Sequence, residues 1–306
     1  MKASRLLPLL FLFFSSAAFA QYSATSNQEA IFQKFLKTKK LVVELSGNAE
    51  YDSALTAAVT KYWKLNPIEF VSPEKMDGKM RNETSALLMP INIQQTTIVT
   101  SDRTSASRPN DQLALMVGNI NVQFNDYDMI AFSVFDPDMG FIGKFNYKED
   151  IGKSLMAITF RLNDVIATLC ETVELIRKDD GKFRNDPIEG VKYMNNKFYN
   201  PRITVLKTKT LYINANDIKH AERVAGVYPY KFKVVSDEEY KKIVKAGGKD
   251  VVYMVVNYSL WGGISLIDAE EHKCVGGIFY GLTPAIDERD MGALTKLIEK
   301  VEKGKK

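Results

Sequence analysis

The sequence predicts an α/β (α+β) protein made of two tandem related domains, each a mixed β-sheet covered by helices. Three observations support this prediction. Short patterns occur twice in the same order, apolar residues recur at helical spacing, and runs of β-branched and aromatic residues lie between the helical segments. The composition agrees, because 306 residues with 45% hydrophobic and 25% charged side chains are typical of a globular protein. A collagen-like fibre, a wholly disordered chain and a polytopic membrane protein are excluded.

The duplication is visible in four matched pairs of segments. Residues 36–39, Leu-Lys-Thr-Lys, reappear as residues 206–209, and each copy leads into a run typical of a strand. Because four matches in one order are hard to obtain by chance, we interpret the chain as two copies of one unit. The other matched pairs are 70–72 with 234–236, 87–92 with 252–257, and 133–136 with 265–268.

Each unit is expected to follow the order β-α-β-α-β-β-β-α. In the first unit, a strand over residues 41–45 precedes a helix for which we expect Asp52 to be the N-cap. Ser72 and Pro73 predict the start of the next helix, because proline at the first helical position loses no hydrogen bond. In the second unit, Ser236 predicts a capping box, and residues 251–258 predict a buried strand.

The later elements of each unit are a hairpin and a closing helix. Residues 136–140 and 268–273 each lie between two apolar runs, so each is expected to turn a hairpin. Apolar residues at i, i+3 and i+4 spacing then predict a long helix ending near Ile176 and a shorter one ending near Val301.

These patterns predict the domain boundaries. The first α/β domain is expected over residues 21–177 and the second over 201–306, joined by a linker over 178–200 that is rich in asparagine, glycine and proline. The first unit is longer than the second. Its extra residues are polar with turn propensity, which predicts an inserted loop at about 93–130 with room for an additional hairpin.

Residues 1–20 have the layout of a secretory signal peptide. A short basic region precedes an apolar run over 6–14, and small residues end at Ala20, so cleavage is expected between Ala20 and Gln21. The alternative, an uncleaved anchor, calls for an apolar run of about 20 residues. The mature chain is therefore expected to be periplasmic or secreted, without a transmembrane segment. A net charge of +4, evenly spread, does not indicate a nucleic-acid partner.

The order of elements resembles a known type of envelope domain. A helix beginning with residues 52–55 (Asp-Ser-Ala-Leu), a second beginning with 71–74 (Val-Ser-Pro-Glu), and a hairpin turning at an aspartate are similar to the periplasmic CsgG/LpoB/TolB-N-terminal type of α/β domain. The resemblance covers both units and implies this fold and a role in binding other proteins in export, assembly or cell-wall machinery. The chain lacks the lipid-anchoring cysteine, pore-forming insert and propeller repeats of those families, so their specific activities are not implied.

The sequence contains no nucleophile elbow, zinc-protease motif, phosphate loop or dinucleotide fingerprint, so we predict no catalytic, cofactor-binding or metal-binding residues. Two short segments have weak metal-binding patterns, for which an ordinary turn is the alternative interpretation. Glu271, His272 and Cys274 would ligate a metal poorly, because adjacent strand residues point to opposite faces. Asp136 and Asp138 have the outline of a calcium loop, but the later acidic ligand is absent. Turns explain both patterns better.

The two cysteines, Cys170 and Cys274, admit two interpretations. An oxidising compartment would permit a disulfide between them. Cys170, however, lies on the apolar side of a predicted helix, where a free thiol behaves as a small buried hydrophobe. The sequence leaves their pairing open.

Aromatic and arginine residues supply the candidate partner surface. Aromatic rings give much contact area at low entropy cost, although burial in the core is the alternative for the same residues. The candidates are Tyr228, Tyr230, Tyr258, Trp261, Arg103 and Arg108.

Taken as a whole, the sequence predicts a non-enzymatic extracytoplasmic binding or scaffold protein of a bacterial cell-envelope assembly, with an envelope protein or glycan as partner and no cofactor. The alternative is a hydrolase acting on envelope glycan or peptide, with its site between the two domains. That alternative requires converging carboxylates with perturbed pKa values at the junction of the domains.

Overall fold

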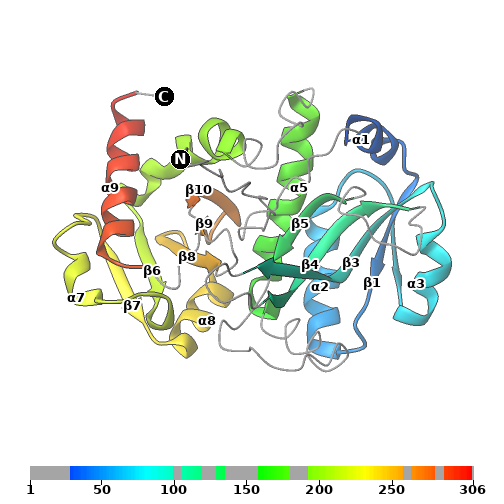
Figure 1. The fold of residues 1–306 in the computed structure, drawn as a ribbon, viewed down its shortest axis with the longest axis horizontal. Helices are drawn as coiled ribbons and strands as arrows, with labels where there is room; N and C mark the ends of the chain where they lie inside the picture. Colours follow the sequence, from blue (N-terminus) through cyan, green and yellow to red (C-terminus); the bar gives the residue numbers. More distant parts are fainter. Residues whose placement is uncertain are drawn as a thin grey trace, which may run out of the picture.

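The computed structural model describes residues 28–98, 105–118, 129–134, 158–179, 192–257, 263–279 and 286–304. The expected signal peptide with Ala20 and Gln21, the turn over 136–140, and Arg103, Tyr258 and Trp261 lie outside these residues. Two five-stranded mixed sheets, sheet A and sheet B, stand on either side of helix α5 (Leu162–Lys178), as Figure 1 shows. The predicted α/β class is confirmed. Among the described helices, none is both long enough and apolar enough to cross a bilayer.

Sheet A belongs to the first unit, and its strand order is β2-β1-β3-β4-β5. Strand β1 runs parallel to β2 and β3, while β4 pairs antiparallel with both β3 and β5. Helix α1 (Gln28–Leu36) precedes the sheet. The elements that follow are β1 (Lys40–Glu44), α2 (Ala49–Tyr62), β2 (Ile68–Val71), α3 (Pro73–Met80), β3 (Ser85–Ile98), β4 (Ser105–Val117) and β5 (Met129–Val134).

Sheet B belongs to the second unit, and its order β10-β9-β8-β6-β7 has the same topology as sheet A read from the opposite edge. Strand β6 is parallel to β7 and β8, and the other pairs are antiparallel. The predicted order β-α-β-α-β-β-β-α therefore holds in both units. The elements are β6 (Thr210–Asn214), α7 (Ala221–Val224), β7 (Phe232–Val235), α8 (Asp237–Ala246), β8 (Val251–Asn257), β9 (Gly263–Asp268), β10 (Lys273–Phe279) and α9 (Glu288–Glu302).

The pairing registers change two of the sequence matches. Leu41 pairs with Ala86 in sheet A, and Leu211 pairs with Val252 in sheet B, so Ala86 and not Leu87 corresponds to Val252. Similarity of residue types does not define the register of this match. The strand pairing does, because a shift of one residue exchanges the two faces of a strand. The match of 133–136 with 265–268 is also not equivalent, because the first segment begins in β5 and the second lies in β9.

Part of the expected insertion at about 93–130 forms the hairpin for which the sequence leaves room. Residues 93–98 continue β3 and residues 105–117 form β4, and the two strands pair without a register shift from Ala86 to Ile98. The segment is polar, but Thr96, Thr97 and Ile98 are β-branched, and β-propensity decides here over polarity. The extra length of the first unit is therefore mainly a long hairpin.

Local signals set the helix starts. Asn48, and not Asp52, caps α2, because its side chain accepts hydrogen bonds from the amides of Glu50 and Tyr51. Asp52 lies inside the helix, where its carboxylate accepts from the amide of Ser46 at 2.7 Å and so fixes the preceding loop. At α8, Ser236 accepts from the amide of Glu239, as the capping-box pattern predicts.

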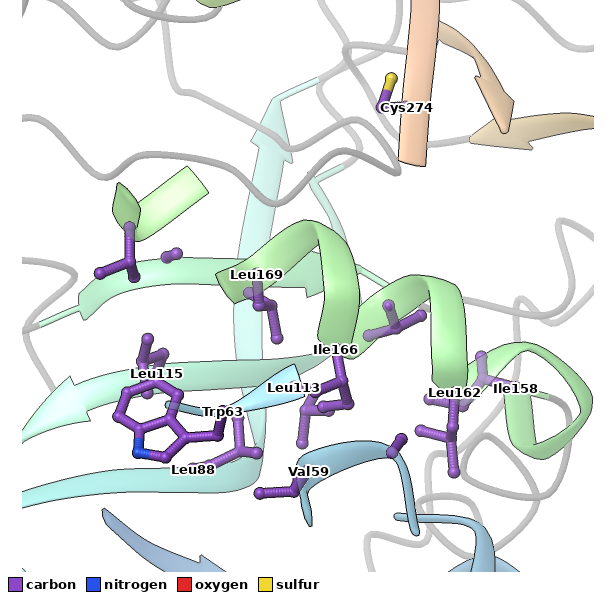
Figure 2. Packing of buried hydrophobic residues seen from close by; sticks show 14 of the residues in the cluster. Val59, Trp63, Leu88, Leu113, Leu115, Ile158, Leu162, Ile166, Leu169 and Cys274 are labelled. Carbon is purple, nitrogen blue, oxygen red and sulfur yellow. The ribbon is translucent and has the colours of Figure 1, made fainter. Parts of the chain in front are cut away.

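Helix α5 is the centre of the largest hydrophobic core, and it is buried on nearly every side. Figure 2 shows Ile166 and Leu169 of α5 on the side of the helix that faces Leu113 and Leu115 of β4, while the strand that carries Cys274 lies on the other side of the helix. The same cluster includes residues of sheet B and α8. These second-unit members are Val235, Tyr240, Val244, Tyr253, Val255, Ile267, Ala269 and Cys274. The facing sides of the two units thus share one core.

The end of the predicted linker also belongs to this core. Residues 195–207 form consecutive helical turns, within which Tyr199 is fully buried. The Tyr199 hydroxyl lies 3.1 Å from the Thr172 hydroxyl of α5. The connection therefore packs against the helix that it follows, which limits independent movement of the units.

The shared core makes a testable prediction about stability. Leu169→Ala should lower the free energy of unfolding by about 2–5 kcal/mol, because it removes buried apolar contacts and leaves a cavity. Since α5 packs on both sheets, urea unfolding followed by circular dichroism should show one transition that shifts as a whole. Leu36→Ala is the control, because Leu36 is exposed at the end of α1 and its loss should change stability by less than about 0.5 kcal/mol. Two separate transitions, of which one is insensitive to Leu169→Ala, would contradict the shared core.

Candidate functional site

The predicted partner surface is only partly placed by the described residues. Tyr228 is 1% exposed, and its ring packs edge-to-face on Tyr230 at 5.4 Å and on Phe232 at 6.0 Å between centroids. Tyr228 is therefore a core residue, and the expectation that it faces a partner is wrong. Tyr230 is half-buried beside it. Arg108 lies in β4, opposite Gln95 of β3.

A polar cluster joins the two units where α5 begins. Asp164, in the first turn of α5, is buried and accepts a hydrogen bond from the hydroxyl of Tyr253 in β8. Its other oxygen, Oδ1, lies 2.6 Å from Nδ1 of His272. One carboxylate of the first unit thus binds two side chains of the second. We call Asp164, Tyr253 and His272 the junction cluster.

His272 is held by both units. It lies in the turn between β9 and β10 with φ 54°, a left-handed conformation that is uncommon for residues other than glycine. Its ring meets the ring of Tyr62 in α2 edge-to-face, with 6.0 Å between centroids. Its side chain is 18% exposed. The tight turn therefore directs His272 into the junction, whereas the sequence indicated an ordinary exposed turn.

The neighbours of His272 do not form a metal site with it. The Glu271 carboxylate pairs with Lys273 at 3.0 Å, and Cys274 is fully buried in the shared core. Among the described residues, no three His, Cys, Asp or Glu side chains are grouped as metal ligands.

Burial dominates the electrostatics of the junction cluster. It raises the pKa of Asp164 above its usual value, and the hydrogen bond to His272 and the positive charges of Arg161 and Lys61 offset part of that increase. A buried carboxylate that binds one nitrogen of a histidine fixes the orientation of the ring. The arrangement can therefore hold His272 in place and tie the units together. Glu171, further along α5, pairs with Arg202 of the helical turns at 2.9 Å instead of approaching Asp164.

A second perturbed carboxylate lies at the end of β1. Helix α2 packs on one face of sheet A and α3 on the other, so the end of β1 is the topological switch point of the sheet. Burial raises the pKa of Glu44 there to about 7, and Asp77 of α3 adds to the increase. Its Oε2 is buried without a hydrogen-bond partner. In the second unit Asn214 takes this position and donates to Asp237 at 2.8 Å.

Both cysteines are free thiols. Burial raises the pKa of Cys170 to about 12 and that of Cys274 to about 12, so each remains a protonated thiol at neutral pH. Neither has the depressed pKa that a nucleophilic cysteine needs.

No protein-family model matches this sequence, and no curated protein matches it.

The junction cluster predicts a difference between two buried tyrosines. Tyr253→Phe should lower the free energy of unfolding by about 1–3 kcal/mol, because it removes a hydrogen bond and leaves an oxygen of buried Asp164 without a donor. Tyr228→Phe is the matched control, because the Tyr228 hydroxyl is buried without a partner and its removal should be neutral or stabilising. Urea denaturation monitored by circular dichroism measures both. Equal losses in the two variants would show that the Asp164 contact contributes nothing.

Glu44 predicts a pH-dependent stability. Because its folded pKa of about 7 exceeds its ordinary value of 4.5, its contribution is fully present below pH 4.5 and is lost as the pH rises through 7. Glu44→Gln should therefore leave stability unchanged near pH 4 and raise it at pH 8. The full shift corresponds to about 3 kcal/mol, which partial solvent screening reduces to about 1–2 kcal/mol.

A second glutamate provides the control for this pH experiment. Hydrogen bonds from Lys40 and Lys79 lower the pKa of Glu69, so its contribution to stability is present at neutral pH and is lost on acidification. Glu69→Gln should therefore destabilise the protein at pH 8, the opposite of Glu44→Gln. Thermal denaturation across pH 4–8 compares both variants with the wild type. The same sign for both would contradict the assignment for Glu44.

Proposed function

We propose that this protein is a non-enzymatic extracytoplasmic binding or scaffold protein of a cell-envelope assembly, and that the hairpin formed by β3 and β4 is its interaction element. The observation that carries the proposal is the length of this hairpin. Strands β3 and β4 have 14 and 13 residues, whereas their counterparts β8 and β9 have 7 and 6. The two units share a topology and differ most in this element.

Most of the extra length extends beyond the neighbouring strands. Strand β1 pairs with β3 only over 85–88, and β5 pairs with β4 only over 112–116. Residues 92–98 and 105–111 thus form a two-stranded ribbon, which we call the arm. Within the described part of the chain, no third strand pairs with the arm. Because a two-stranded ribbon is marginally stable alone in water, an arm of this length favours a role in binding a further strand or surface.

The remainder of the molecule suits the presentation of such an arm. The two units share a core through α5, and the Asp164, Glu171 and Thr172 side chains bind groups of the second unit or its preceding turns. A rigid body loses little conformational entropy on binding, which favours affinity. The N-terminal signal pattern supports an extracytoplasmic location, and the partner is then an envelope protein or glycan.

The hydrolase alternative has one observation in its favour. Asp164 binds His272 between the two units and orients its ring, as a catalytic base requires. The alternative also requires converging carboxylates, whereas Glu171, the next acidic residue of α5 after Asp164, pairs with Arg202. Activity of the purified protein on envelope glycan or peptide, abolished by His272→Ala, would establish this alternative.

The proposal is tested by isolating the mature protein from its native envelope and identifying what remains bound. Replacing residues 92–111 by an Asn-Gly turn would remove the arm while keeping the pairing of 86–91 with 112–117, because Ile91 and Gln112 form a hydrogen-bonded pair that such a turn can close. We expect retention of bound proteins or glycan to fall at least about tenfold, as loss of a binding hot spot implies.

Arg289→Ala is the control for this experiment, because Arg289 is 86% exposed and lies on α9 at the far side of sheet B. It should retain the same material as the wild type. Equal retention by the shortened variant, with unchanged circular dichroism, would overturn the role of the arm.

A further inference from the structure

The two edges of the arm can be told apart from the hydrogen bonds at its base. The amide of Gly118 donates to the carbonyl of Ser85 at 2.8 Å, so the main-chain groups of Ser85 face β4. The amide of Lys39, just before β1, donates to the carbonyl of Thr84 at 2.8 Å. Main-chain groups alternate along a strand, so odd-numbered residues of β3 face β4, and even-numbered ones face the edge where β1 lies.

Beyond Leu88 this second edge of β3 has no described neighbour. The register with β4 continues unshifted to Ile98, so the main-chain N–H and C=O groups of Asn92, Gln94, Thr96 and Ile98 point away from β4. Pro90 fits the same phase, because a proline is tolerated where its missing N–H would face outward. We call this row of four residues the open edge.

The opposite edge of the arm is interrupted. The β4 residues paired with the open-edge residues are Asp111, Pro109, Ser107 and Ser105, and their main-chain groups face away from β3. Pro109 has no N–H to donate and stands in the middle of this edge. Proline within an edge strand is one of the devices that prevent strand addition. The open edge is therefore the one suited to receive a strand.

The composition of the open edge lacks the usual protection. Residues 91–98, Ile-Asn-Ile-Gln-Gln-Thr-Thr-Ile, contain no charge and no proline, and five of the eight are β-branched. Exposed edges normally carry lysine, proline or a bulge, and an uncharged β-prone segment without them pairs readily with other strands. Such an edge indicates an occupant.

We propose that a second copy of this chain occupies the open edge, so that two β3 strands pair antiparallel across a twofold axis. This inference rests on the proposed role of the arm in binding. The open edge is self-complementary: a register centred on Gln95 sets Asn92 opposite Ile98 of the second copy and Gln94 opposite Thr96 of the second copy. Each such pair exchanges two main-chain hydrogen bonds, and no like charges oppose one another.

The same geometry stops the assembly at a dimer. Pairing joins the two arms into a four-stranded sheet, which has the strand number needed for stability that one arm lacks. The outer edges of that sheet are the two β4 strands, and each carries Pro109. Further strand addition is thus blocked, and the twofold contact closes on itself instead of growing into a fibre.

Sedimentation equilibrium of the purified mature protein tests this proposal without any envelope component. We expect a dimer whose dissociation constant rises at least about tenfold in Gln94→Pro, because the variant removes a donor from the centre of the open edge. Gln94 lies opposite Pro109, in a pair that exchanges no hydrogen bond within the hairpin. The matched control is Ser107→Pro, which removes an outward donor from the β4 edge and should leave the dimer intact.

A charge variant preserves every main-chain group. Gln95→Lys places two lysines opposite each other at the twofold axis, so the dimer should weaken at low salt and recover at high salt. This variant decides the matter if Gln94→Pro does not fold.

A monomeric wild type, or a dimer unaffected by Gln94→Pro and Gln95→Lys, would overturn the proposal. Because dimerisation is measured on the purified protein, its failure leaves the envelope-capture result untouched. If the wild-type protein dimerises but captures no envelope protein or glycan, only the proposed function is contradicted.

Discussion

The burial of helix α5 between two sheets is the constraint on which the rest of the structure depends. A helix that covers one sheet needs one apolar stripe, whereas α5 packs on sheet A with one side and on the second unit with the other. Its polar residues on the second side are consequently removed from water. Each of these buried side chains then needs a polar partner, because a carboxylate that is buried without one strongly lowers the stability of the folded protein. Tyr253, His272 and Arg202 are the partners that Asp164 and Glu171 receive.

This packing also makes the two units unequal, although they share a topology. In sheet A, the face that packs in the core around α5 is the face covered by α2, and it includes Val43. In sheet B, the face in this core is the one covered by α8, and it includes Tyr253. Helix α8 is the counterpart of α3, which covers the opposite face of sheet A. The units therefore pack through different faces, as in a heterologous contact, and not about a twofold axis. Because the two units pack through different faces, equivalent positions have different surroundings and can carry different side chains. Glu44 and Asn214 are one such pair of equivalent positions.

The order of helices and strands is predictable from local signals in the sequence. The candidate sites depend on contacts between residues far apart in the sequence, which such signals do not reveal. Capping residues and β-branched runs predict where helices and strands lie, because those effects act within a few residues. The pairing of His272 with Asp164 joins residues 108 positions apart, and no periodicity encodes it. Tyr228 illustrates the same limit, since the residue type is common in both cores and interfaces. The polar composition of the arm predicts an exposed loop with room for a hairpin, and polarity alone does not distinguish the two, because a strand without a packed face has the same composition.

Duplication offers a physical reason why the arm is the element most free to serve function. The base of the hairpin, Ser85 to Leu88 on β3, is fixed by β1 and by the shared core, so changes there disturb both units. In the arm, residues 92–98 and 105–111, no third described strand pairs with the hairpin, and lengthening it there adds main-chain pairs without repacking α5. Such lengthening also leaves an unpaired strand edge, which can form main-chain hydrogen bonds with strands of unrelated chains. Pro109 closes one side of the arm to that hazard, and the absence of any equivalent on Asn92 to Ile98 marks the other side as the one kept available for a specific strand.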